Sequence, residues 1–71
     1  MPYYCVNKNA QPQNGDHEVH DTSSTRACLP VPTNRIALGF HSTCSSAVGE
    51  AKKHFDDVNG CFYCVSTCHT T

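Results

Sequence analysis

Four side chains that can bind a metal ion lie within residues 61–69, CFYCVSTCH. Thiolate sulfur and imidazole nitrogen are preferred ligands of zinc, and a Cys-x-x-Cys turn lets both of its sulfurs converge on one ion. The same thiols can instead pair as disulfides or carry out redox chemistry. The segment therefore has three alternative chemistries, which are metal binding, disulfide formation and thiol redox.

The length of the chain makes the cysteines candidates for a structural role. The 71 residues include six Cys, three Phe, three Tyr and no Trp, and they suit one small domain spanning 1–71. At this size, burial of apolar area at about 25 cal/mol per Å² barely offsets roughly 1.5 kcal/mol of ordering entropy per residue. We therefore expect a metal ion or disulfides to supply stability that the hydrophobic core cannot.

The redox state of the thiols depends on the compartment. Met1 is followed by neither a basic leader nor an apolar segment, and no run approaches the roughly 20 apolar residues of a membrane span. We therefore expect a cytoplasmic protein with no membrane partner. Cytoplasmic thiols stay reduced, and clustered cysteines there bind metal more often than they pair. This expectation favours a metal-binding domain with zinc as the cofactor.

Alternation of side chains predicts three strands. Residues 2–9 (PYYCVNKN) and 17–21 (HEVHD) carry aromatic and β-branched residues and are joined through the turn dipeptide Asn14-Gly15, which predicts a hairpin. Residues 22–34 have no period and contain two prolines, so we expect a loop. Residues 35–40 (RIALGF) alternate cleanly and predict the third strand.

Residues 42–55 (STCSSAVGEAKKHF) predict the only helix, because their apolar side chains recur at helical spacing. Ser42 or Thr43 can cap its start. Gly49 costs about 1 kcal/mol relative to Ala, which we explain by close packing of the helix on the sheet. Residues 56–60 (DDVNG) then end the helix in a turn. The expected fold is α+β, with a three-stranded antiparallel sheet, one helix and a C-terminal Cys-rich knuckle.

A structural zinc site needs four ligands, of which the Cys61-x-x-Cys64 turn supplies two. His20 ends the second predicted strand and Cys28 follows in the loop, and the hairpin can bring this edge beside the end of the helix. The predicted ligands are His20, Cys28, Cys61 and Cys64. Cys68 or His69 can substitute for His20. Otherwise both stay free, or Cys68 pairs with Cys5 or Cys44. Metal binding at such a site is coupled to folding.

Residues 18–64, EVHDTSSTRACLPVPTNRIALGFHSTCSSAVGEAKKHFDDVNGCFYC, resemble the Ada-type small zinc-binding domain of bacterial DNA-alkylation repair proteins. In that family a Cys/Cys or His/Cys pair precedes a Pro-containing loop, an NRI or NRV strand, an Ala-rich helix, a Gly turn and Cys-x-x-Cys. The resemblance implies zinc as the cofactor and nucleic acid as a partner. It places the four predicted ligands at the ligand positions and Asn34-Arg35-Ile36 at the start of the strand.

The whole chain also resembles a group of short, uncharacterised bacterial Cys-rich proteins. They begin MPYY.VNKN.Q..GDHEVH and end in a Cys-rich CHT tail. That resemblance implies a compact fold and carries no established activity.

The charge balance does not support nucleic-acid binding. The net charge is -1, and the five Lys and Arg residues are scattered along the chain, whereas phosphate contacts require a basic excess. Four aromatic residues could in principle stack on bases, but no basic residues are interleaved with them, so we expect them to form a small hydrophobic core. These residues are Tyr3, Tyr4, Phe62 and Tyr63.

The leading hypothesis is a non-enzymatic, zinc-stabilised module that contacts a macromolecule, either nucleic acid or protein. The alternative from another class is a domain without metal, in which six cysteines form three disulfides. A third alternative is a thiol redox protein, although a redox Cys-x-x-Cys usually opens a helix and this one follows it. Adjacent Cys68 and His69 do not suit a nucleophile and its base, so no catalytic residue is predicted. The sequence leaves the partner and the oligomeric state open.

Overall fold

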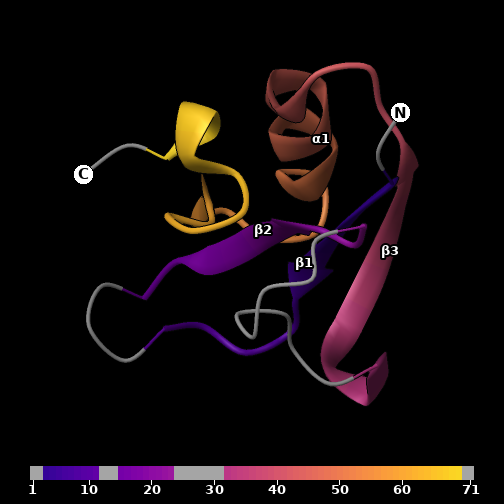
Figure 1. Ribbon diagram of the computed structural model, residues 1–71. Coiled ribbons are helices and arrows are strands. Elements are labelled where there is room, and N and C mark those ends of the chain that lie inside the picture. The colour runs from indigo at the N-terminus through magenta and orange to yellow at the C-terminus, as the bar shows by residue number, and fades with distance from the viewer. Residues whose placement is uncertain (1–2, 12–14, 24–31, 70–71) are drawn as a thin grey trace.

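The computed structural model describes residues 3–11, 15–23 and 32–69. A sheet forms one layer, and a single helix packs against its strands to form the other (Figure 1). The elements in chain order are β1 (Tyr3–Asn7), β2 (His17–Asp21), the 3-10 turn η1 (Pro32–Asn34), β3 (Arg35–Phe40), α1 (Cys44–Ala51), β4 (Val58–Gly60) and the 3-10 turn η2 (Ser66–Cys68). The predicted α+β class and the hairpin of the first two strands are confirmed.

The sheet has four strands in the order β3-β1-β2-β4, so the three predicted strands are present and antiparallel, but the prediction missed a fourth strand that makes the sheet mixed. β1 pairs antiparallel with β2 and β3, whereas β4 pairs parallel with β2. β4 has only three residues and lies within the segment 56–60 that we predicted as a turn. Three residues are too few for an alternation signal, and parallel pairing depends on a distant partner.

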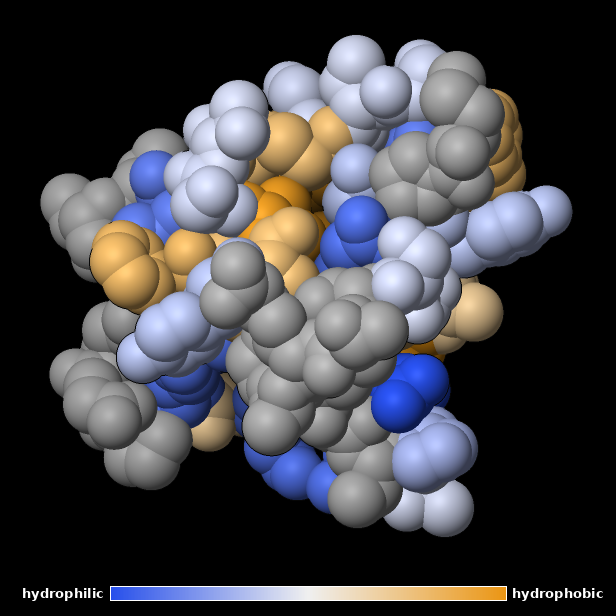
Figure 2. Space-filling view, in the orientation of Figure 1, coloured by the Kyte–Doolittle hydropathy of each residue, from blue (hydrophilic) through white to orange (hydrophobic). Residues whose placement is uncertain are grey.

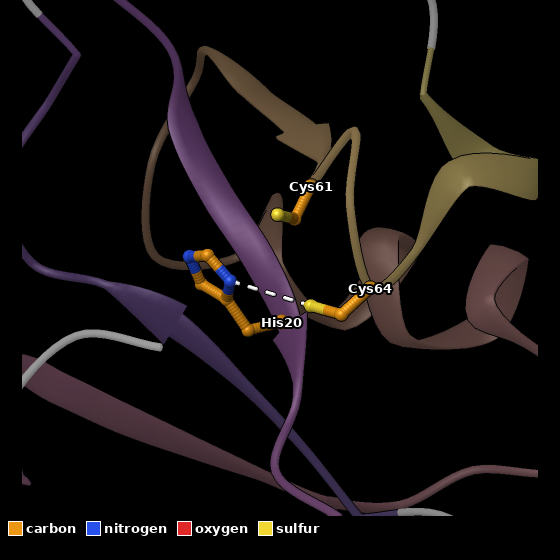
Figure 3. Close-up of side chains that lie close together, drawn as sticks. All are labelled: His20, Cys61 and Cys64. Atoms are coloured by element: carbon orange, nitrogen blue, oxygen red, sulfur yellow. Dashed lines mark hydrogen bonds between the residues drawn. The ribbon is translucent and has the colours of Figure 1, made fainter. Parts of the chain in front are cut away.

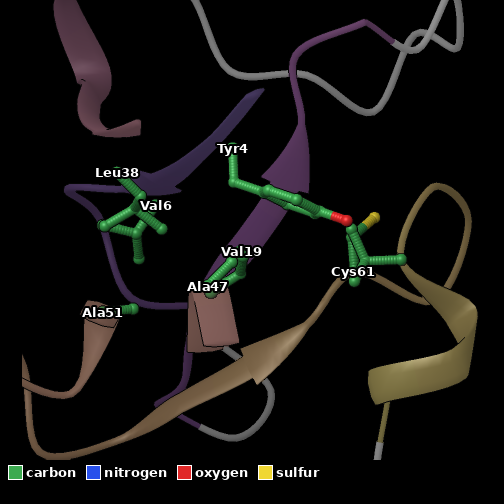
Figure 4. Close-up of a cluster of buried hydrophobic side chains, with 8 residues drawn as sticks. Tyr4, Val6, Val19, Leu38, Ala47, Ala51 and Cys61 are labelled. Atoms are coloured by element: carbon green, nitrogen blue, oxygen red, sulfur yellow. The ribbon is translucent and has the colours of Figure 1, made fainter. Parts of the chain in front are cut away.

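The hydrophobic core lies between the central strands and α1 (Figure 4). Val6 of β1 and Val19 of β2 are register partners, and both are fully buried. The ring of Tyr4 extends across the core toward Cys61 (Figure 4). The buried cluster consists of Tyr4, Val6, Val19, Leu38, Ala47, Ala51, Cys61 and Val65. The core is therefore small, and it includes one cysteine of the C-terminal segment.

The helix is confirmed, but α1 ends at Ala51 and not at Phe55. Thr43 is its N-cap, and the Thr43 side chain accepts a hydrogen bond from the Ser46 backbone N–H at 3.2 Å. Ala47 and Ala51 are fully buried, which lets the helix approach the sheet closely. Phe55 lies beyond the end of the helix and stacks on His17, with ring centroids 3.6 Å apart.

The expected packing of Gly49 against the sheet is wrong. Gly49 is exposed, and a Cβ atom added there would meet nothing within 4 Å. Gly60 is the glycine that close packing requires. A Cβ atom at Gly60 would lie 2.9 Å from the carbonyl carbon of Cys68 and from the carbonyl oxygen of Val65. The backbone of the C-terminal segment therefore folds directly over the end of β4.

The aromatic side chains are distributed differently from the prediction of a small aromatic core. Tyr4 is buried, but Tyr3, Phe62 and Tyr63 are 61%, 59% and 63% exposed. Phe62 and Tyr63 belong to the turn between two cysteines and are exposed there. Within residues 3–11, 15–23 and 32–69, no helix has the length and apolar character needed to cross a membrane.

The two glycines give opposite predictions for substitution by alanine. Gly49→Ala should raise the free energy of unfolding by about 0.5–1 kcal/mol, because it removes backbone entropy of the unfolded chain without a steric cost. Gly60→Ala should lower it by about 1–3 kcal/mol, because the new methyl group must displace backbone. Denaturant unfolding of both variants measures the difference. Equal effects of the two substitutions would contradict the packing described here.

Candidate metal centre

His20, Cys61 and Cys64 form a compact group of potential metal ligands. One ligand atom of each residue lies within 4.8 Å of the other two, and the imidazole and both sulfurs point toward one another (Figure 3). His20 and Cys61 are 1% exposed, and Cys64 is partly buried. The structure thus brings together three of the four predicted ligands, while Cys28 lies outside the described residues.

The parallel pairing of β2 with β4 places His20 beside Cys61. Val19 is the register partner of Gly60, so the next residue of each segment is a neighbour of the other. The Cys61 backbone N–H donates to the carbonyl oxygen of Val19 at 2.9 Å, which extends the ladder by one bond. The position of the first thiol is therefore set by main-chain hydrogen bonds.

A tight turn brings the second thiol to the same place. Residues 62–64 form the turn, and the Val65 N–H closes it by donating to the Cys61 carbonyl oxygen at 2.9 Å. Val65 is buried in the core and anchors the end of the turn. This geometry lets the Cys61 and Cys64 sulfurs converge, as the Cys-x-x-Cys spacing predicts.

The two nitrogens of His20 have different surroundings. Nδ1 lies 3.5 Å from Cys64 Sγ, and Nε2 lies 3.7 Å from Oε1 of Glu18. A carboxylate at Nε2 favours the tautomer that carries its proton there, which leaves the lone pair of Nδ1 directed at the thiols. At 3.7 Å the contact is electrostatic and not a hydrogen bond, and it favours the tautomer in which Nδ1 is the atom available to a metal ion.

Burial keeps the imidazole in the form that binds metal. Burial, with a smaller contribution from the positive charge of Arg35, lowers the pKa of His20 from 6.5 to about 4. The ring is consequently neutral at pH 7, as a metal ligand must be.

Glu18 was missed by the sequence analysis, although a signal was present. It lies two residues before His20 on a strand, and side chains at this spacing project from the same face of a sheet. A carboxylate beside a metal-binding histidine is a common arrangement. Burial raises the pKa of the Glu18 carboxyl.

The proposed substitutes for His20 are engaged elsewhere. Cys68 forms a disulfide with Cys44, and the Cα atoms of the two residues are 6.1 Å apart. His69 Nδ1–H donates to the carbonyl oxygen of Gly60 at 3.0 Å. Neither residue belongs to the three-residue group.

The remaining cysteines bear on the alternative with three disulfides. That alternative requires every cysteine to be paired in a disulfide, but among the described residues Cys5 and Cys61 are free thiols. Cys5 is 2% exposed and is the register partner of His20, yet it lies outside the ligand group. Burial raises the pKa of the Cys5 thiol, which therefore stays protonated at neutral pH.

Comparison of the chain with models of known families, with curated proteins and with solved structures finds no match. The resemblance to the Ada-type domain therefore stays a prediction from the sequence motifs. The geometry of His20, Cys61 and Cys64 is what supports a metal centre.

The pKa of His20 predicts how the metal-free chain responds to acid. An unfolded histidine binds its proton near pH 6.5, whereas His20 in the folded chain binds it only near pH 4. Stability contributed by the neutral ring is thus present above pH 6.5 and is lost as the pH falls toward 4, by up to about 3 kcal/mol. Denaturant unfolding in chelator across this range measures the loss.

Two substitutions separate this effect from the titration of carboxylates. His20→Asn should flatten the dependence of stability on pH between 6.5 and 4. His54→Asn changes an exposed histidine and should leave the dependence as in the wild type. The same slope in both variants would show that His20 does not titrate as described.

Proposed function

We propose that this chain is a small, non-enzymatic module stabilised by one zinc ion, with His20, Cys61 and Cys64 as ligands and Cys28 as the fourth. The observation that carries the proposal is the convergence of three ligand atoms from β2 and the C-terminal turn to within 4.8 Å. Two thiolates and an imidazole favour zinc over the hard cations Mg²⁺ and Ca²⁺, which prefer oxygen ligands.

One distance supports a tetrahedral ion between these side chains. Zinc binds nitrogen at about 2.0 Å and sulfur at about 2.3 Å, so the two atoms are about 3.5 Å apart across a tetrahedral angle. The separation of His20 Nδ1 and Cys64 Sγ is 3.5 Å. These two ligands therefore already have the spacing that zinc coordination requires.

A structural role fits better than a catalytic one. Catalytic zinc keeps one coordination position open for water or substrate, whereas four protein ligands close the shell. With Cys28 as the fourth ligand, the ion would tie the part of the chain that carries Cys28 to β2 and to the C-terminal turn. A chain with so small a core gains folding free energy from such a link.

The proposed role of the module is to contact another macromolecule through the metal-bound turn. Phe62 and Tyr63 lie between the two cysteine ligands, are mostly exposed and pack edge to face with ring centroids 5.2 Å apart. Zinc coordination on either side would hold these rings as a rigid pair. The net charge of -1 favours a protein partner over the nucleic acid that the Ada-type resemblance suggests.

We also propose that the module works in the cytoplasm. A centre with two thiolate ligands requires reduced cysteines, which the thiol pool of that compartment would maintain, and the same pool would act to open the Cys44–Cys68 disulfide.

Native mass spectrometry tests the metal centre. We expect one zinc per chain, removed by chelation with a fall in melting temperature, because bound metal stabilises the folded state. Cys61→Ser should abolish zinc binding, because serine offers no soft thiolate ligand.

Cys5→Ala is the matched control, since it removes a buried thiol next to His20 that is outside the ligand group. This variant should keep its zinc. A wild-type chain that binds no zinc, or a Cys61→Ser variant that binds it as tightly as the wild type, would refute the proposed centre.

Glu18 provides a second test, because it acts on the metal through His20. Glu18→Gln keeps the size of the side chain but removes the charge at Nε2, and should weaken zinc binding about 10- to 100-fold. Competition with a chromophoric chelator measures the affinity. Glu50→Gln removes a carboxylate from α1 that pairs with Lys53, and should leave the affinity unchanged.

A further inference from the structure

The Cys44–Cys68 disulfide is a reactive group that the metal centre does not use. It joins the first residue of α1 to the last residue of η2, across 24 positions of the chain. Neither cysteine is fully buried. Cys68 also lines a surface groove, which lets a thiol from solution approach that end of the bond.

A groove leads to this bond. It is lined by Ser45, Val48, Gly49, Lys52 and Cys68, and its volume is about 300 Å³. Hydrophobic side chains gather at the surface between α1 and the C-terminal segment (Figure 2). The volume is at the lower end of the range for small-molecule sites, so the groove suits a ligand of about the size of a short peptide.

The two sulfurs of the bond differ in how well they can leave as thiolates. Cys44 is the first residue of α1, and Thr43 caps that end. Backbone N–H groups at a helix N-terminus stabilise a negative charge, so a thiolate leaves more readily from that position. Cys68 ends a 3-10 turn and lines the groove. Attack at Cys68, with departure of Cys44, is therefore the favoured direction.

The groove also carries a positive charge. Among the described residues that line it, Lys52 is the charged one. The neighbouring Lys53 has its ammonium group 3.2 Å from Glu50 and does not line the groove. Gly49 leaves open space above the helix. A thiol that carries a carboxylate can therefore lie along α1 with its negative charge near Lys52.

We propose that the Cys44–Cys68 disulfide is an exchange site for an anionic low-molecular-weight thiol that binds in this groove. The incoming thiolate attacks Cys68 Sγ and forms a mixed disulfide, while the Cys44–Cys68 bond breaks and its electron pair stays on Cys44. A second thiolate then attacks the sulfur of the bound thiol and releases Cys68. The two thiols leave as their own disulfide, and the protein gains two electrons and two protons.

This proposal does not depend on the metal centre. His20, Cys61 and Cys64 take no part in the exchange, and the disulfide would react in the same way with or without zinc. Failure of zinc binding and failure of thiol exchange are therefore separate results.

The test is the rate at which glutathione, which carries carboxylates, opens the disulfide of the full chain. Cysteamine, which carries an amine, is the comparison thiol. Lys52→Glu should slow the reaction with glutathione about three- to tenfold, because the charge at the groove is reversed, and should not slow the reaction with cysteamine. Lys53→Glu makes the same change on the adjacent lysine and should leave both rates near those of the wild type.

Two further measurements complete the test. Peptide mapping of the trapped mixed disulfide should place glutathione on Cys68, and Gly49→Gln, which fills the groove without adding charge, should slow both thiols. The proposal is overturned if glutathione is found on Cys44, if the two lysine variants slow glutathione equally, or if the disulfide opens only when denaturant unfolds the chain.

Discussion

The parallel pairing of β2 with β4 is the interaction on which the site depends. Only three residue pairs make it, yet it returns the chain from α1 to the edge of the hairpin. It sets Cys61 beside His20 and starts the turn that brings in Cys64. Gly60 at the end of β4 is part of the same constraint, because the backbone of Val65 and Cys68 leaves no space for a side chain there.

The position of each described cysteine relative to this pairing decides its chemistry. Cys61 and Cys64 follow β4 directly and face an imidazole, so they suit a metal ion. Cys68 lies one short turn further, out of reach of that group but next to the start of α1, where it meets Cys44. Sulfur atoms a few residues apart thus have different partners, because Cys64 lies beside His20 whereas Cys68 lies beside the start of α1.

Local patterns were enough to predict the hairpin, the strand RIALGF, the helix with Ser42 or Thr43 as its cap, and the turn of Cys61-x-x-Cys64. These features depend on residues close together in the chain. The parallel strand and the Cys44–Cys68 bridge could not be selected from the sequence, because each depends on which distant segments become neighbours. The open position of Gly49 was missed for the same reason, since a glycine in a helical pattern does not reveal whether its face is covered.

By itself the sequence determined the types of ligand available, the turn that presents two of them, and the need for stabilisation beyond a small core. The tertiary structure decided which histidine joins the two thiols and which carboxylate lies behind it. It also decided which cysteine of the C-terminal segment leaves the cluster to form a disulfide. The reason is geometric, because a metal site or a disulfide requires atoms a few ångströms apart, and that distance arises only when the register of the sheet is set.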